Sequence, residues 1–352
     1  MTRIDISKKL QAGTELFDNK AYPAAVAILE QIYKKSPESV KGLNALFLIC
    51  QSKNFLKSSD QKEYWMKLSE KKDLLITKEL SFYYETALYE IALLFLEEKN
   101  FDQAREYFKL LIKDRPNSSL ADNSIFQLAL LFKKENKLDG ATKILQSIIE
   151  KYPDSDILEK IQKEKGNINI ALLFSPHETK YTQAYIIKPG DSLALIAKNF
   201  NTTVEFIKKA NRMEKATIRP TDRLIVPKVK FSIVVDKSKN TLTLKGDEQV
   251  IKVYSVGTGK YNKTPIGNFY VTTKLIDPPW YSKEGLIPSG DKRNLLGTRW
   301  LGINVTSYGI HGTTQPETIG SQSSEGCIRM LNEEVEELYS IVPENTEVII
   351  ID

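Results

Sequence analysis

Two hydrophobic periods divide the chain into a helical part and a part rich in strands. Up to residue 175, apolar residues recur at the spacing of one helix face, as Leu88, Ile91 and Phe95 illustrate. From Lys230 onward the period falls to two, in short runs separated by Lys, Asn, Gly and Asp. This change of period predicts an all-α N-terminal domain and a β-rich C-terminal domain.

The C-terminal part contains five strand-like runs and one stretch with helical spacing. The helix is predicted from Asn332 to Ile341, with acidic residues in its first turn, where the helix dipole favours them. The predicted strands are 231–236, 240–245, 249–257, 268–273 and 347–352.

The helical part, residues 1–175, contains an internal repeat. One copy is marked by Phe101, Ala104 and Pro116. The matching positions 37 residues later and 79 residues earlier are Leu138, Ala141, Pro153, Tyr22, Ala25 and Pro37. The longer separation predicts a degenerate unit between the first and second copies.

A period in the thirties, with a small Ala where helices cross and a Pro after the second helix, resembles the tetratricopeptide repeat. The resemblance implies a stacked solenoid with a concave surface. Two functions stay equally open: a groove that binds a protein or peptide, or a spacer and self-association arm. Tyr83, Tyr84 and Tyr89 fit either the groove or the core.

The helical pattern is expected to stop between residues 166 and 183. Gly166, Pro176 and a polar run after it are typical of a linker, which we place at 176–184. His177 is predicted to be an exposed residue of this linker.

Residues 185–228 form a small unit with the order strand, helix, helix, strand. The turn Pro189-Gly190-Asp191 precedes a helix capped by Asp191 or Ser192, and a second helix is capped near Thr203. The unit resembles a LysM module over its whole length. The resemblance implies that N-acetylglucosamine-containing glycan binds between two loops. The alternative is a folded module that has lost sugar binding. The loop residues are Gly190, Asp191, Ser192, Ile218, Arg219 and Pro220.

Charge and cysteine content exclude several classes of protein. The 50 basic and 45 acidic side chains give a net charge of +5, and the lysines are scattered, which is not the footprint of a nucleic-acid-binding protein. No stretch reaches the roughly 18 apolar residues that would span a bilayer. Cys50 lies in an apolar helical run and is predicted to be a buried structural residue.

The chemistry of the chain is predicted to lie between Ile310 and Met330. His311 and Cys327 are the only histidine and cysteine of the C-terminal segment, and both have glycine neighbours. A thiol becomes a good nucleophile when it is ionised, and a nearby imidazole is the usual base. Gly326 allows a tight turn that aims amide groups at a developing oxyanion. The pattern indicates a Cys–His dyad.

Residues 229–352 resemble the L,D-transpeptidase (YkuD-like) family. The resemblance rests on His-Gly-Thr at 311–313, Ser-Glu-Gly-Cys-Ile-Arg-Met at 324–330, and the strings 257–259, 264–269 and 296–302. Many relatives place a second His before the Gly-Cys pair, where this chain has Glu325. That departure bears on local pKa tuning and not on the dyad.

The resemblance implies roles for individual residues. Cys327 is the nucleophile, His311 the base and later the acid, and the Gly312 carbonyl orients the imidazole. Amides around Gly326 and Cys327 would form the oxyanion hole. The residues implied to shape the loop or contact a substrate carboxylate are Ser324 and Arg329, with a structural ion pair equally open for Arg329. Trp280 and Trp300 are expected in the β-core or the cleft wall.

The implied reaction joins a peptidoglycan stem peptide to an amine through a thioester on Cys327, with release of D-alanine. It needs neither metal nor organic cofactor, and carbapenems are expected to acylate the same sulfur. The alternatives are an L,D-carboxypeptidase, or a wall-binding scaffold without catalysis. The N-terminus has no apolar leader, as in a cytoplasmic protein or one whose leader was removed. Wall chemistry favours the periplasm or cell wall.

Overall fold

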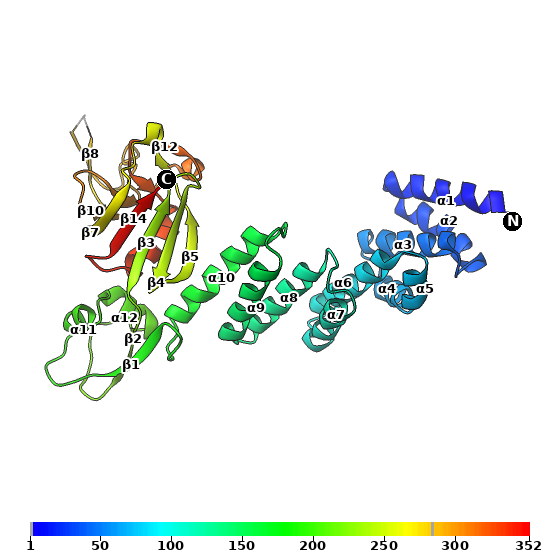
Figure 1. Ribbon diagram of the computed structural model, residues 1–352, viewed down its shortest axis with the longest axis horizontal. Helices are drawn as coiled ribbons and strands as arrows, with labels where there is room; N and C mark the ends of the chain where they lie inside the picture. The colour runs from blue at the N-terminus through cyan, green and yellow to red at the C-terminus, as the bar shows by residue number, and fades with distance from the viewer. Residues whose placement is uncertain (1–2, 283–284) are drawn as a thin grey trace. The chain divides into compact units, whose positions relative to one another are not determined.

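The structure, a computed structural model, describes residues 3–282 and 285–352. The chain divides into two compact units, Met1–Leu158 and Glu159–Asp352 (Figure 1). Helices make up the first unit, and the second combines helices with β-sheets. Within the described residues, no helix is both long and apolar enough to cross a membrane.

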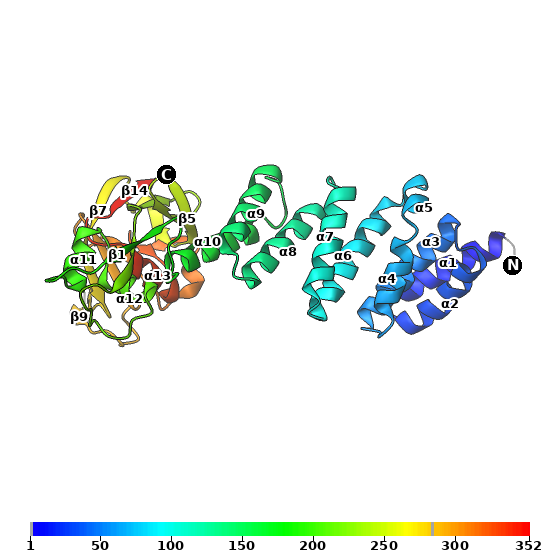
Figure 2. The ribbon, with the colours of Figure 1, turned by 90° about the horizontal axis from the view of Figure 1, so that it is seen from below.

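The first unit is a row of antiparallel helices, seen from below in Figure 2. Neighbours pack as hairpins, with α6 on α7 and α8 on α9. The helices are α1 (Arg3–Asp18), α2 (Tyr22–Lys35), α3 (Val40–Phe55), α4 (Gln61–Ser69), α5 (Lys72–Thr77), α6 (Ser81–Glu97), α7 (Phe101–Asp114), α8 (Ala121–Lys134) and α9 (Leu138–Lys151).

The backbone confirms the repeat that the sequence predicts. The helices α2, α7 and α9 begin at its three marker positions, and the alanines Ala25, Ala104 and Ala141 are fully buried. The residue two places before each of these helices has a positive φ, which reverses the chain direction between helices. These residues are Lys20 (60°), Lys99 (61°) and Asn136 (59°). The two short helices α4 and α5 occupy the place of the predicted degenerate unit.

The helix α10 (Leu158–Leu173) ends inside the interval 166–183 where the sequence predicts the helical pattern to stop, but it corrects the assignment of Gly166 to that break. Gly166 lies in the middle of this helix, where a Cβ would come within 2.8 Å of the Lys252 side chain. The glycine is thus a point of close packing. Asn169 of the same helix donates a buried hydrogen bond of 2.8 Å to the carbonyl of Ile251.

Residues 182–227 confirm the predicted strand, helix, helix, strand order. The elements are β1 (Thr182–Ile186), α11 (Leu193–Asn199), α12 (Val204–Ala210) and β2 (Arg223–Pro227), with β1 antiparallel to β2. Ser192 caps α11 and Thr203 caps α12 through their side-chain oxygens. Their apolar faces meet in a core that includes Ile196 and Ile207.

The C-terminal region is built on an eight-stranded sheet of order β13-β11-β10-β7-β14-β3-β4-β5. Side chains of β3 alternate between buried and half-buried, which is the period of two found in the sequence. The strands are β3 (Phe231–Asp236), β4 (Thr241–Gly246), β5 (Gln249–Ser255), β7 (Gly267–Ile276), β10 (Arg299–Ile303), β11 (Gly309–His311), β13 (Ile328–Arg329) and β14 (Glu347–Ile351).

Shorter elements complete the domain. The helix α13 (Asn332–Ile341) has the predicted bounds and packs against β10 and β11. The remaining elements are β6 (Thr258–Gly259), β8 (Trp280–Ser282), β9 (Gly285–Ile287) and β12 (Gln322–Ser324), with 3-10 turns at 260–262 and 316–318.

Candidate active site

The loop that carries Cys327 joins β12 to β13, and hydrogen bonds of one serine fix its shape. The hydroxyl of Ser324 accepts from the Gly326 amide at 3.0 Å and donates to the Cys327 carbonyl at 2.6 Å. Gly326 has φ +133°, a conformation that side chains disfavour, and a Cβ there would collide with the Tyr308 ring. Gly326 is therefore required for the turn before the cysteine.

The sheet register places Cys327 and His311 on one face. His311 lies opposite Arg329 in the parallel pair β11–β13. Side chains two residues apart point to the same side of a strand, so Cys327, Arg329 and His311 share a face. In the described structure no hydrogen bond joins the sulfur to the imidazole, and Sγ contacts the Ser307 carbonyl at 3.5 Å.

The imidazole of His311 is held as a neutral base. The residue is 3% exposed, its Nδ1 lies 2.6 Å from the Gly312 carbonyl, and the Trp300 ring stacks on it at 5.6 Å. Burial, together with the nearby charge of Arg329, lowers the pKa of His311 to about 4, against the opposing backbone contacts of Gly312 and Leu296. With the proton on Nδ1 for Gly312, Nε2 keeps a lone pair for a thiol proton.

Cys327 is a neutral thiol in this state. Burial raises the pKa of Cys327, and the Gly309 amide and the Arg329 charge oppose that rise. Burial therefore disfavours both charged forms, the thiolate of Cys327 and the imidazolium of His311. The arrangement fits a proton transfer that accompanies attack on a substrate.

The guanidinium of Arg329 has no carboxylate partner among the described residues. Its NH1 makes long contacts to Gln315 Oε1 (3.4 Å) and Thr318 Oγ1 (3.5 Å), and its buried Nε has no hydrogen bond. Glu325, by contrast, pairs with Lys260 and Lys263, which lower the pKa of its exposed carboxylate to about 2.

A cavity of about 260 Å³ opens at Cys327. Its wall is mainly aromatic and aliphatic, and it includes both Trp280 and Trp300, which the sequence places in core or cleft. The other lining residues were not predicted from the sequence, although the apolar string at 278–281 in a loop was a usable signal. These are Leu275, Pro278, Pro279, Tyr281, Leu296 and Ser307.

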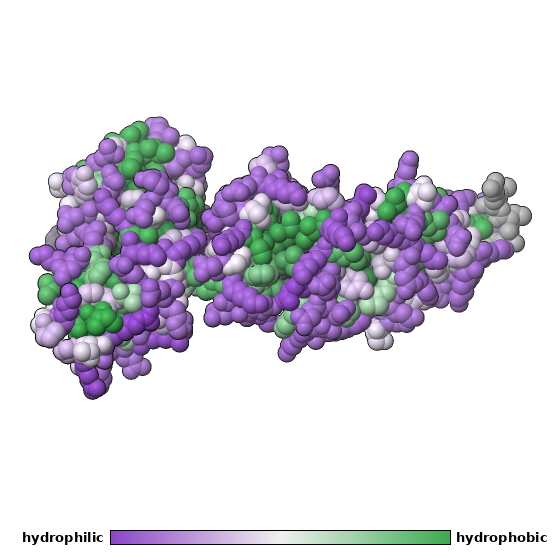
Figure 3. All heavy atoms as spheres, turned by 60° about the horizontal axis from the view of Figure 1, so that its bottom comes forward, coloured by the Kyte–Doolittle hydropathy of each residue, from purple (hydrophilic) through white to green (hydrophobic). Residues whose placement is uncertain are grey.

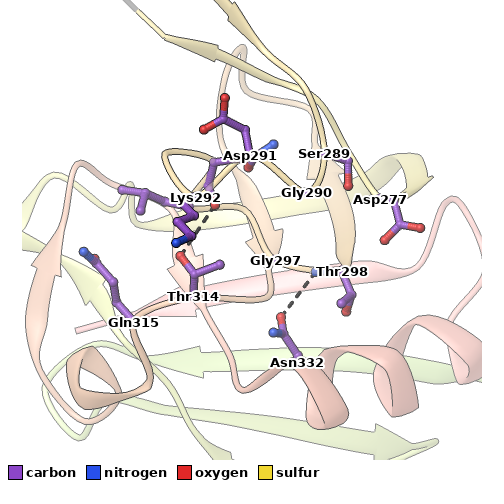
Figure 4. Close-up of a pocket in the computed structure, with 12 residues that line it drawn as sticks. Asp277, Ser289, Gly290, Asp291, Lys292, Gly297, Thr298, Thr314, Gln315 and Asn332 are labelled. Carbon is purple, nitrogen blue, oxygen red and sulfur yellow. Dashed lines mark hydrogen bonds between the residues drawn. The ribbon is translucent and has the colours of Figure 1, made fainter.

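A second cavity of about 640 Å³ is lined in part by Leu295, Gly297 and Thr298 (Figure 4). Leu295 lines this cavity, whereas Leu296 lines the one at Cys327. Asn332 braces the wall, since its Oδ1 accepts from the amides of Thr298 (3.2 Å) and Thr313 (3.1 Å). Neither Cys327 nor His311 lines this polar cavity.

The two loops predicted to bind glycan meet at their bases, where Ile187 exchanges backbone hydrogen bonds with Thr221 and Asp222. Asp191 and Ser192 use their side chains inside the module: Asp191 accepts from the Lys188 amide and the Tyr185 hydroxyl, each at 2.8 Å. Gly190 has φ +89°. Any sugar contact from the first loop would therefore come mainly from its backbone.

The other predicted residues are placed as follows. Cys50 is fully buried in α3, as expected of a structural cysteine, and His177 is exposed. Tyr84 is in the core and bonds Asp114, whereas Tyr83 and Tyr89 are half-buried. In the described part of the chain, no cluster of three or more His, Cys, Asp or Glu could hold a metal ion.

A buried imidazole on β11 and a thiol in the loop that leads into β13, with an apolar cleft at the sulfur, form the candidate site of a cysteine acyltransferase. Family models match an L,D-transpeptidase catalytic domain at residues 230–350, a LysM domain at 185–227, and tetratricopeptide repeats at 86–118 and 123–155. The chain belongs to the L,D-transpeptidase (YkuD) family.

Several known proteins are similar to this chain. It is 34% identical over 173 residues to the putative L,D-transpeptidase YkuD of Bacillus subtilis, covering 47% of this chain and 97% of that protein. It is 43% identical over 126 residues to putative L,D-transpeptidase YqjB of the same organism, covering 34% and 70%. The solved catalytic domain of the Enterococcus faecium L,D-transpeptidase is 27% identical, with 35% and 97% covered and a TM-score of 0.29.

Proposed function

We propose that this protein is a peptidoglycan L,D-transpeptidase in which Cys327 forms a thioester with the third residue of a tetrapeptide stem. The observation that carries the proposal is the shared face of Cys327 and the neutral imidazole of His311. A base with a free lone pair beside a thiol is the requirement for nucleophilic acyl transfer.

The first half of the reaction forms the thioester. The thiol proton passes to His311 as Sγ attacks the carbonyl carbon of the third stem residue, and the carbonyl oxygen becomes an oxyanion. The intermediate collapses, the C–N bond to the terminal D-alanine breaks, and the imidazolium protonates the leaving amine. The products are a neutral imidazole, free D-alanine and an acyl-enzyme.

The second half transfers the acyl group to an amine of a neighbouring stem. The amine attacks the thioester carbonyl, His311 accepts the amine proton and returns a proton to sulfur, and the C–S bond breaks. Water in place of the amine would give L,D-carboxypeptidase activity. Gly312 keeps the proton on Nδ1, which leaves Nε2 as the working nitrogen in both halves.

Arg329 is the candidate for binding a substrate carboxylate. It lacks a carboxylate partner among the described residues and lies on the face of the dyad. A guanidinium binds a carboxylate through two parallel hydrogen bonds. Ser324 acts by holding the nucleophile loop.

The LysM module is proposed to bind N-acetylglucosamine-containing glycan at the loops that carry Gly190 to Ser192 and Ile218 to Pro220. Binding the glycan would raise the local concentration of stem peptides at the catalytic domain. This chemistry supports a location in the periplasm or cell wall. The helical repeats are proposed to hold a protein partner or a second copy, and apolar side chains gather on one face of them (Figure 3).

Tetrapeptide muropeptides and mass spectrometry test the proposal. The parent protein and Cys50→Ala, which changes the other cysteine, should release D-alanine and form cross-linked dimers, whereas Cys327→Ala should not. Equal products from Cys327→Ala and the parent would refute the enzyme, and no products from any of them would favour the scaffold. Release of D-alanine without dimers would favour the carboxypeptidase.

A further inference from the structure

A buried hydroxyl connects β6 with the loop that carries the nucleophile. Thr264 is 1% exposed, and its Oγ1 accepts from the Gly259 amide at 2.8 Å and donates to the Gly326 carbonyl at 2.8 Å. A hydroxyl has one proton, and an amide can only donate. The Thr264 proton is therefore directed at the Gly326 oxygen.

The Gly326 carbonyl belongs to the same peptide unit as the Cys327 amide. The described chain contains no cis peptide bond, and in a planar trans peptide the C=O and N–H groups point in opposite directions. A hydrogen bond that fixes the carbonyl on one side consequently fixes the direction of the Cys327 N–H on the other side.

The Gly326 and Cys327 amides of this loop differ in whether they already donate a hydrogen bond. The Gly326 N–H is already used by the Ser324 hydroxyl. The Cys327 N–H has no acceptor among the described residues, and it belongs to the residue that carries the attacking sulfur. It therefore remains free to donate to an oxyanion.

We propose that Thr264 is a positioning residue, which aims the Cys327 amide at the oxyanion of the tetrahedral intermediate through the Gly326 carbonyl. The inference rests on the acyl transfer proposed above. Donors held in place before the reaction stabilise developing charge without reorganisation during the step. Thr264 would supply that rigidity without touching the substrate.

The packing around Thr264 leaves the groups that bond its hydroxyl little freedom to move. A Cβ on Gly259 would lie 2.7 Å from the Thr264 nitrogen and 2.8 Å from the Gly326 Cα, so two backbones are in direct contact. The Glu325 pairs with Lys260 and Lys263 join the same two segments at the surface. Exposed ion pairs contribute little because water screens them. Two backbone hydrogen bonds between Gly257 and Arg329 also join these segments, and the Thr264 hydroxyl is the link that acts on the Gly326 carbonyl itself.

The test compares two reactions of the same sulfur. Acylation by p-nitrophenyl acetate passes through an oxyanion, whereas alkylation by iodoacetamide displaces iodide at a saturated carbon and forms none. Thr264→Val keeps the shape of the side chain and removes its hydroxyl. It should slow acylation of Cys327 by roughly 10- to 100-fold, less than the roughly 100- to 1,000-fold cost of losing one oxyanion donor outright, with little change in alkylation.

Rescue and a matched control complete the experiment. Thr264→Ser keeps the hydroxyl and should acylate at close to the parent rate. Thr346→Val removes another buried hydroxyl of the same domain, which bonds the Pro343 carbonyl at 2.7 Å, and should slow neither reaction. Thr264→Ala provides the same test if Thr264→Val does not fold.

Two results would overturn the role of Thr264. One is unchanged acylation in Thr264→Val, and the other is an equal slowing of acylation and alkylation, which would mean general disruption of the loop. The ester probe requires no muropeptide. A parent protein that is acylated by the ester and does not process tetrapeptide stems would refute the proposed substrate while the comparison between variants stays valid.

Discussion

His311 and Cys327 are both uncharged at rest because desolvation disfavours the charged form of each side chain. Burial lowers the pKa of the imidazole and raises that of the thiol. Arg329 favours the thiolate and disfavours the imidazolium, so its effects on the ion pair oppose each other. A substrate that expels water from the cleft would find a thiol and a base in their uncharged forms.

Protonation of His311 should make the fold less stable in acid. The pKa is about 4 when folded and about 6.5 when unfolded, so the unfolded chain binds the extra proton first. Stability is therefore fully present above pH 6.5 and falls as the pH drops from 6.5 towards 4. The shift corresponds to a loss of roughly 3 kcal/mol.

Thermal unfolding of the parent and of His311→Gln between pH 7 and pH 4 checks this expectation. Carboxylates titrate in both proteins, so the difference between the two curves isolates the histidine. The parent should lose more of its melting temperature than the variant. Parallel curves would mean that His311 titrates near its ordinary pKa.

Single residues differed in how well the sequence revealed them. Cys327 and His311 stand out as the only cysteine and histidine of their domain, next to glycines. Thr264 has no such signal, because a threonine in a β-rich run is common. Its proposed role depends on the Gly259 amide and the Gly326 carbonyl, which come together only in the fold. Trp300 was placed in the core or cleft, but its stacking on the imidazole needed the register of β10 and β11.

At the scale of elements, local signals determined the helices with clear caps. The sequence predicted a cap at Asp191 or Ser192, a second cap near 202–203 and the bounds of α13, because these depend on residues close in the chain; the caps are Ser192 and Thr203. Gly166 misled the sequence analysis, since its neighbour Lys252 is distant in sequence. A glycine chosen for close packing cannot be distinguished from a helix breaker by sequence alone.

Thr203 has a second function that Ser192 lacks. Each side chain caps a short helix, but Thr203 also donates a buried hydrogen bond of 2.5 Å to the Ser340 carbonyl in α13. Thr203→Ala should therefore lose the cap, worth about 1 kcal/mol, and leave a buried carbonyl unsatisfied, which costs a further 1–3 kcal/mol or so.

Chemical denaturation of Thr203→Ala and Ser192→Ala measures the difference. Ser192 is the matched control because it is an exposed cap in the same module. We expect Thr203→Ala to be the more destabilised of the two. Equal losses would indicate that the bond to Ser340 contributes nothing to stability.

At the scale of the whole molecule, the order of repeats, LysM module and catalytic domain was readable from the change of hydrophobic period and from the motifs. The end of the repeat domain was harder to place. The sequence puts it at residue 175, and that boundary stays a prediction. The compact units separate at Leu158, so α10 is grouped with the second unit although it has the period of the first.

Two fragments, 159–352 and 176–352, decide where α10 belongs. Removing α10 would expose the site where Gly166 packs on Lys252 and would delete the buried bond from Asn169 to Ile251. The shorter fragment should melt at least about 4 °C lower, the change expected for one to two kcal/mol in a domain of this size. Asn169→Ala in the longer fragment isolates the hydrogen bond and should give a smaller decrease. Equal melting temperatures for the two fragments would assign α10 to the repeats, because the catalytic unit would then be complete without it.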